Sequence, residues 1–113
     1  MLFKEIRPCR TKGALEVIPA QPFDLPLEMV ESLLRNGRFE VVNAGILFVA
    51  SRDALTETTL YEDGRMLVKS LDPREVHKSA SRVFWHATGN QEDAEYEEYV
   101  AAGRVRGGRK PPQ

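Results

Sequence analysis

A turn signal at Asp63-Gly64 constrains the fold of this chain more than any other sequence feature. Glycine accepts the positive φ that a two-residue hairpin loop requires, and aspartate tolerates it. Threonine and apolar residues stand on both sides of the pair, as they do in short β-strands. A two-residue loop pairs Leu60 with Leu67 and leaves apolar side chains on both faces of the hairpin. The sequence therefore predicts a hairpin that lies inside a larger antiparallel sheet.

A helix is expected directly after this hairpin. Asp72 is a favourable N-cap, Pro73 suits the first helical position, and Glu75 completes the spacing of a capping box. Gly89 suits the position that ends such a helix. Apolar residues recur with the period of one helical face, at Val76, Ala80, Val83, Phe84 and Ala87. We expect this stripe to pack on the sheet.

Trp85 lies outside that stripe. At about 100° per residue, it projects about 180° away from Val76, among polar residues. A tryptophan in such a position needs a cover. Tyr96, Tyr99 or Val100 could fold back over it. Alternatively, Trp85 could anchor a partner, since aromatic side chains are favoured at interfaces.

The segments before the hairpin carry mainly strand signals. Residues 2–7 are expected to form a short strand that ends at Pro8. Residues 14–18 and 38–43 are expected to form two more, because apolar and polar side chains alternate along them. The run at 46–50 is almost wholly apolar, which predicts a central strand buried on both faces.

A short helix is expected between the second and third of these strands. Asp24 is its predicted N-cap, and Asn36-Gly37 is its predicted end. The resulting fold class is α+β, a curved antiparallel sheet with two main helices on one face. The chain then divides into a single α+β domain over residues 1–90, a short acidic amphipathic helix packing on it over 91–103, and a disordered basic tail over 104–113.

The hairpin residues and this order of elements together suggest a relationship. The hairpin carries Leu60-Tyr61, then Gly64-Arg65, then Met66-Leu67-Val68, followed by a short linker and a helix. In this respect the chain resembles one half-repeat of the TATA-box-binding protein fold, over about residues 14–87. The resemblance implies a curved sheet with a long helix across its back. It also implies that Tyr61 stands on the concave face, where that family carries DNA-kinking phenylalanines.

The composition argues against several functional classes. The chain has 113 residues and a formal net charge of −1, so no overall field favours nucleic acid or an anionic membrane. Its single cysteine excludes a disulfide within the chain and fits a reducing compartment, which we expect to be the cytoplasm. There is no apolar run of membrane-spanning length and no signal-peptide core, so we expect no membrane contact.

Few residues suggest catalysis or a bound cofactor. Cys9 lies between Arg7 and Arg10, whose charge could favour a nucleophilic thiolate, but no base is close in sequence. His77 and His86 are expected on opposite faces of one helix, so they cannot share a metal ion. We therefore expect no cofactor, no metal and no catalysis, with a Cys9-dependent enzyme as the least favoured alternative.

The favoured function is a small protein-interaction module, with a homodimer as one form of it. Trp85 and Tyr61 are the candidate contact residues of the domain. The alternative is a nucleic-acid-binding protein that uses the concave sheet face and the basic tail residues Arg104, Arg106 and Arg109. The near-neutral charge of the chain argues against this alternative.

Overall fold

The computed structural model describes residues 3–9, 13–21, 24, 26–51 and 56–102. The elements of this part of the chain are β1 (Phe3–Pro8), β2 (Leu15–Pro19), α1 (Leu27–Asn36), β3 (Phe39–Asn43), β4 (Leu47–Ser51), β5 (Glu57–Leu60), β6 (Met66–Val68), α2 (Pro73–Ala87) and α3 (Asp93–Ala101). The strands form one antiparallel sheet in the order β1-β2-β6-β5-β4-β3, which does not close into a barrel. The predicted α+β fold class is confirmed.

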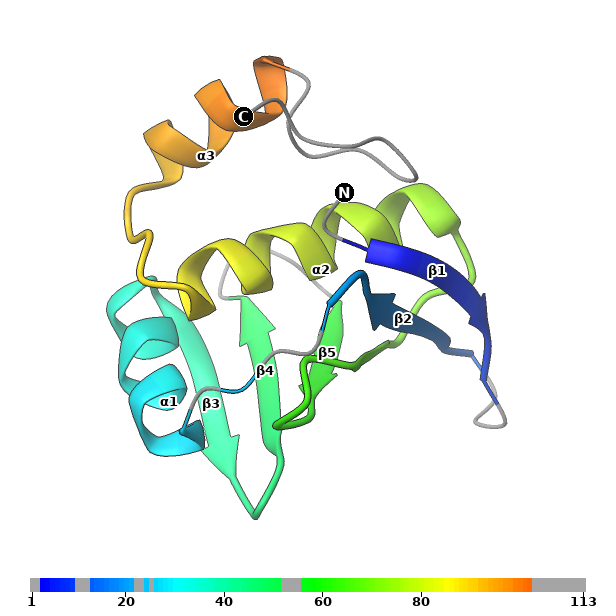
Figure 1. Ribbon diagram of the computed structural model, residues 1–113, viewed down its shortest axis with the longest axis horizontal. Coiled ribbons are helices and arrows are strands. Elements are labelled where there is room, and N and C mark those ends of the chain that lie inside the picture. The colour runs from blue at the N-terminus through cyan, green and yellow to red at the C-terminus, as the bar shows by residue number, and fades with distance from the viewer. Residues whose placement is uncertain (1–2, 10–12, 22–23, 25, 52–55, 103–113) are drawn as a thin grey trace.

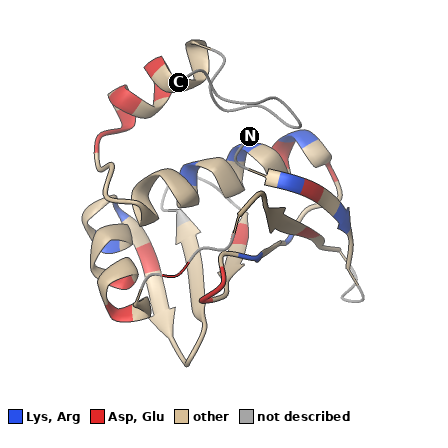
Figure 2. Ribbon diagram, in the orientation of Figure 1, with Lys and Arg blue, Asp and Glu red and all other residues tan. Residues whose placement is uncertain are grey.

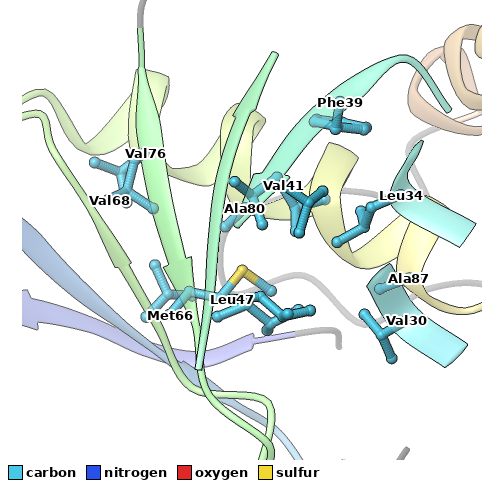
Figure 3. Packing of buried hydrophobic residues seen from close by; sticks show 14 of the residues in the cluster. Val30, Leu34, Phe39, Val41, Leu47, Met66, Val68, Val76, Ala80 and Ala87 are labelled. Carbon is cyan, nitrogen blue, oxygen red and sulfur yellow. The ribbon is translucent and has the colours of Figure 1, made fainter. Parts of the chain in front are cut away.

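The elements lie in layers. The helix α2 crosses one face of the sheet, α1 lies on the same face beside β3, and α3 lies beyond α2 on the side away from the sheet (Figure 1). One hydrophobic core fills the space between the sheet and the first two helices. Side chains from the strands, α1 and α2 meet in it (Figure 3). Residues buried there include Val17, Val30, Leu34, Leu47, Leu60, Met66, Val68, Val76 and Ala80.

The register of the central hairpin differs from the prediction. Leu60 lies opposite Met66, not Leu67, so the loop between β5 and β6 is one residue longer than the predicted two-residue loop. Because successive side chains of a strand point to opposite faces, this shift exchanges the two faces of β6. Met66 and Val68 are therefore buried against the helices, and Leu67 points the other way. The prediction that the hairpin lies inside a larger sheet is correct.

A three-residue loop at 62–64 causes this difference. The Tyr61 N–H donates to the Arg65 carbonyl at 2.9 Å, and the Gly64 N–H donates to the Tyr61 carbonyl at 2.9 Å. Gly64 has a φ of 89°, the left-handed conformation expected at the end of such a loop. The Asp63 side chain accepts from the Arg65 N–H at 3.1 Å, which stabilises this three-residue loop.

The run predicted to be buried on both faces is buried on one. Leu47 and Val49 of β4 point into the core, with exposed fractions of 0% and 2%, whereas Phe48 is 47% exposed. The sheet carries helices on a single face in the described chain, so alternate residues of its central strands face away from them. An apolar run therefore does not show by itself that both faces of this strand are buried.

The ends of α2 match the prediction except in one detail. The Asp72 side chain accepts from the Arg74 N–H at 3.0 Å and caps the helix. The predicted capping box is wrong, because the Asp72 N–H donates to the Ser70 hydroxyl at 3.1 Å and not to Glu75. After the helix, Gly89 adopts a left-handed φ of 94° and its N–H donates to the His86 carbonyl at 3.1 Å.

The start of α1 is also corrected. The predicted cap Asp24 lies before the helix, which begins at Leu27 and has no side-chain cap. Pro26 has an extended ψ of 129°, so the helix cannot extend back to Asp24. The Pro26 carbonyl accepts the first helical hydrogen bond, from the Val30 N–H at 3.1 Å. The predicted end of the helix at Asn36-Gly37 is confirmed.

Candidate interaction surfaces

The sheet face turned away from α1 and α2, here called the open face, is one candidate surface. Its side chains include Glu16, Glu40, Val42, Phe48, Glu57, Thr59, Leu67 and Lys69. Phe48 lies between its cross-strand neighbours Val42 and Thr59, and Thr59 lies opposite Leu67. Val42 is 64% exposed and Phe48 is 47% exposed. The centre of the face is therefore an exposed apolar row.

A shallow hollow accompanies this row. It has a volume of about 310 Å³ and is lined in part by Val42, Phe48, Thr59, Glu57 and Lys69. Large apolar side chains beside a hollow are typical of contact surfaces, where they can enter a pocket or receive a partner's side chain.

Ion pairs surround the apolar row. Lys69 Nζ lies 2.8 Å from Glu57 Oε2, and Arg7 Nη2 lies 3.1 Å from Glu16 Oε1. Arg65 Nη1 lies 3.9 Å from the same carboxylate oxygen of Glu16. Glu5 Oε2 also lies 3.6 Å from Arg7 Nη1, so three carboxylates, Glu5, Glu16 and Glu57, accompany these three cations.

The structure places Tyr61 at the hairpin end of the open face. The guanidinium of Arg65 lies over its ring, with Cζ 5.0 Å from the ring centroid. Arg65 also pairs with Asp63, at 2.8 Å between Nε and Oδ2. The predicted contact residue is therefore half-buried beneath a cation that already has carboxylate partners.

Both edges of the sheet are obstructed. In an antiparallel sheet, the backbone groups of successive residues point alternately to the strands on either side. The Lys69 N–H donates to the Glu57 carbonyl, and this bond sets the alternation in β5 and, through the register, in β4 and β3. The N–H and C=O groups of Val41 therefore point to the side of β3 that has no neighbouring strand. Arg35 Nη2 donates to that Val41 carbonyl at 3.1 Å. At the other edge, β1 contains Pro8, which has no N–H to donate.

The second candidate surface is the outer side of α2, where α3 covers Trp85. The Trp85 and Tyr99 ring centroids lie 4.7 Å apart, and those of Trp85 and Tyr96 lie 6.2 Å apart. The Tyr96 hydroxyl donates to the Lys78 carbonyl at 3.3 Å. Burial, with the Glu97 charge nearby, raises the pKa of Tyr96 to about 12. The cover over Trp85 expected from the sequence is therefore present.

Asp93, at the start of α3, makes a polar contact beside these rings. One carboxylate oxygen lies 3.0 Å from Arg82 Nη2, and the other lies 3.1 Å from His86 Nε2. Burial acts to raise the pKa of Asp93. Hydrogen bonds from His86 and Arg82 outweigh it, so the pKa lies below its usual value. His86 is completely buried, which no sequence pattern predicts, because its neighbours come from separate segments.

The predicted contact residues are not brought together. Trp85 packs against Tyr99 of α3, whereas Tyr61 lies on the open face of the sheet, beneath Arg65. Arg104, Arg106 and Arg109 lie outside the described residues. The residues that the sequence interpretation missed are Phe48 and Val42. For Val42 the signal was its place in the alternation of residues 38–43, on the same face as Glu40, whereas the apolar run around Phe48 carries no such signal.

The residues considered for catalysis or metal binding are Cys9, His77 and His86. Cys9 is half-buried, and the charge of its neighbour Arg7 is engaged by Glu16 and, at 3.6 Å, by Glu5. His77 packs edge-on against Phe3, and His86 packs against Phe39. The described part of the chain contains no group of three or more histidine, cysteine or carboxylate side chains that could hold a metal ion.

None of the helices in the described ranges is both long and apolar enough to cross a membrane. Comparisons of the chain with protein families, with curated proteins and with solved structures found no match. The resemblance to a TATA-box-binding protein half-repeat therefore stays a prediction.

Proposed function

We propose that this chain is a non-catalytic protein-interaction module that pairs with a second copy of itself through the open face of its sheet. The observation that carries the proposal is the exposed apolar row centred on Phe48 and Val42, beside a hollow of about 310 Å³. Burying such side chains against a partner removes apolar surface from water, which is the main favourable term in protein association.

The obstructed edges support pairing by the face. A second chain that extended the sheet beside β3 would have to displace Arg35 from the Val41 carbonyl, and Arg35 is also held by Glu31 at 2.7 Å. Beside β1, Pro8 offers no N–H group to a new strand. Face-to-face packing of two sheets needs none of these backbone groups.

The charge balance of the open face supports self-pairing. In a two-fold dimer each surface meets its own copy, so an excess of one sign would repel. Here Lys69, Arg7 and Arg65 are paired with carboxylates of the same face. The same balance disfavours the nucleic-acid alternative, since binding to phosphates depends on cations that are free to replace counterions.

Sedimentation equilibrium over a range of protein concentrations tests this proposal. We expect a mass that rises from one chain to two, and little change with added salt, because the contact is apolar. Phe48→Glu should hold the chain at the mass of a monomer while leaving its melting temperature nearly unchanged.

The matched control is Met29→Glu, because Met29 is 53% exposed on α1, away from the open face. This variant should dimerise like the parent chain. A parent chain that remains monomeric at all concentrations contradicts the proposal. Equal loss of the dimer in both variants would place the contact elsewhere.

A further inference from the structure

A second hollow lies at the contact between α2 and α3, on the other side of the molecule from the open face. It has a volume of about 430 Å³ and is lined by Trp85, Tyr99, Glu95, Glu98 and Ala102. We call it the aromatic-acidic hollow. The Trp85 and Tyr99 rings are inclined by 51° with centroids 4.7 Å apart, so they form a bent aromatic wall.

The two carboxylates of this hollow lie on one side of α3. Glu95 and Glu98 are three residues apart in the helix, so their side chains are neighbours on its surface. Acidic residues gather along α3 more densely than along the other helices (Figure 2). Glu95 and Glu98 are exposed, so they are accessible to a molecule that enters from solvent.

The aromatic rings and the carboxylates of the hollow together favour a planar cation. The face of an aromatic ring carries negative electrostatic potential and attracts cations, and carboxylates add charge of the same sign. Anions are therefore disfavoured. A bare divalent metal ion would need more oxygen ligands than the two carboxylates supply. A planar guanidinium group can stack on the rings and donate hydrogen bonds to carboxylates at the same time.

We propose that the aromatic-acidic hollow binds the guanidinium group of an arginine side chain. Two sources can supply this group. One is a basic segment of another chain. The other is the chain's own sequence after Ala102, which carries Arg104, Arg106 and Arg109. Ala102 itself lines the hollow, and Arg104 follows it in the sequence after one glycine.

Trp85 is the only tryptophan of the chain, so its fluorescence reports directly on this hollow. The probe is a short peptide of alternating arginine and glycine. Its control is the same peptide with citrulline in place of arginine, which keeps the shape but removes the charge. Titration of the full chain with the arginine peptide should change the Trp85 emission in a saturable way, and the citrulline peptide should have no such effect.

Substitutions that remove charge without changing size test the assigned residues. Glu95→Gln combined with Glu98→Gln should weaken binding of the arginine peptide about tenfold or more, since hydrogen bonds to charged groups are lost. Glu62→Gln combined with Glu97→Gln removes the same charge at exposed positions that do not line the hollow. This control should bind like the parent chain.

A third variant of the full chain separates the two sources. It carries Arg104→Gln, Arg106→Gln, Arg109→Gln and Lys110→Gln. Tighter binding of the arginine peptide by this variant supports occupation by the chain's own segment. Unchanged affinity supports a segment of another chain. The proposal is overturned if neither chain gives a saturable signal, if the citrulline peptide binds equally well, or if both pairs of glutamine substitutions act alike.

Discussion

The ring of His86 lies directly against the α-carbon of Gly37, so closely that a β-carbon on residue 37 would lie 2.5 Å from His86 Nδ1. Gly37 is the C-cap of α1, and His86 is in the last turn of α2. This contact lets the two helices approach each other at the edge of the core. The backbone of Gly37 does not need glycine, because its φ of −82° suits any residue.

Gly37→Ala should therefore destabilise the fold for steric reasons alone. The His86 ring is completely buried and its Nε2 is bonded to Asp93, and overpacking of this kind costs about 2 kcal/mol. Chemical denaturation measures the free energy of unfolding. The comparison is Gly45→Ala, where φ is +85° and nothing lies near the added carbon, so only backbone strain of about 1 kcal/mol is expected. A Gly37→Ala variant as stable as the parent chain would contradict the close contact.

Lowering the pH should loosen the contact of α3 with α2. The pKa of Asp93 in the folded chain lies below its usual value of 3.8. A carboxyl group of this kind stabilises the fold fully above its unfolded-state pKa, and the contribution is lost as the pH falls through the folded-state pKa. Stability should thus fall below about pH 4. Trp85 fluorescence between pH 7 and pH 3 follows the change.

Asp93→Asn provides the control for that titration. It keeps the shape of the side chain and removes the titrating group, so the part of the acid dependence due to this contact should disappear. If the Trp85 fluorescence of this variant changes with pH as it does in the parent chain, protonation of Asp93 is not what loosens the contact of α3.

Tyr96→Ala should destabilise the docked helix more than Tyr99→Ala. Tyr96 is 3% exposed and Tyr99 is half-buried, so the first substitution leaves the larger cavity. We expect a cost of about 3 kcal/mol for Tyr96→Ala. The Trp85 emission should also shift to longer wavelength as water reaches the ring. Tyr96→Phe isolates the hydroxyl bond to Lys78 and should cost about 1 kcal/mol. The opposite ranking of the two alanine variants would contradict this packing.

Gly64→Val should be among the more damaging substitutions in the hairpin. Gly64 has a φ of 89°, a region that β-branched residues resist, and the residue is buried. A loss of about 2 kcal/mol is expected from strain and crowding. Thermal unfolding measures it, with Gly13→Val as a comparison at a similar φ of 77° in open space. If both variants melt at the temperature of the parent chain, the left-handed turn is not maintained in solution.

Local signals predicted much of the fold because their causes are local. The cap at Asp72 and the cover over Trp85 follow from hydrogen bonding and side-chain periodicity within short segments. The hairpin register could not be predicted in the same way. A two-residue and a three-residue loop both accept Asp63-Gly64, and the choice depends on bonds between Tyr61 and Arg65 that form only in the folded turn.

Burial that depends on distant segments was also beyond local patterns. His86 is polar by type, yet Gly37 and Phe39 enclose it from one part of the chain and Asp93 from another. Phe48 shows the reverse case, since an apolar run predicts burial although no helix of the described chain covers that face. The candidate surface thus arises from how the layers stack, which no single segment encodes.

The guanidinium of Arg35 on the Val41 carbonyl also limits how copies of this chain can aggregate. Strands that join edge to edge can add a further chain at each new edge, so such contacts lead to filaments. A face that pairs with its own copy is covered by that single contact, so assembly stops at two chains. By closing one edge with a side chain of α1, the fold protects a sheet rich in β-branched residues from open-ended polymerisation while leaving its face available.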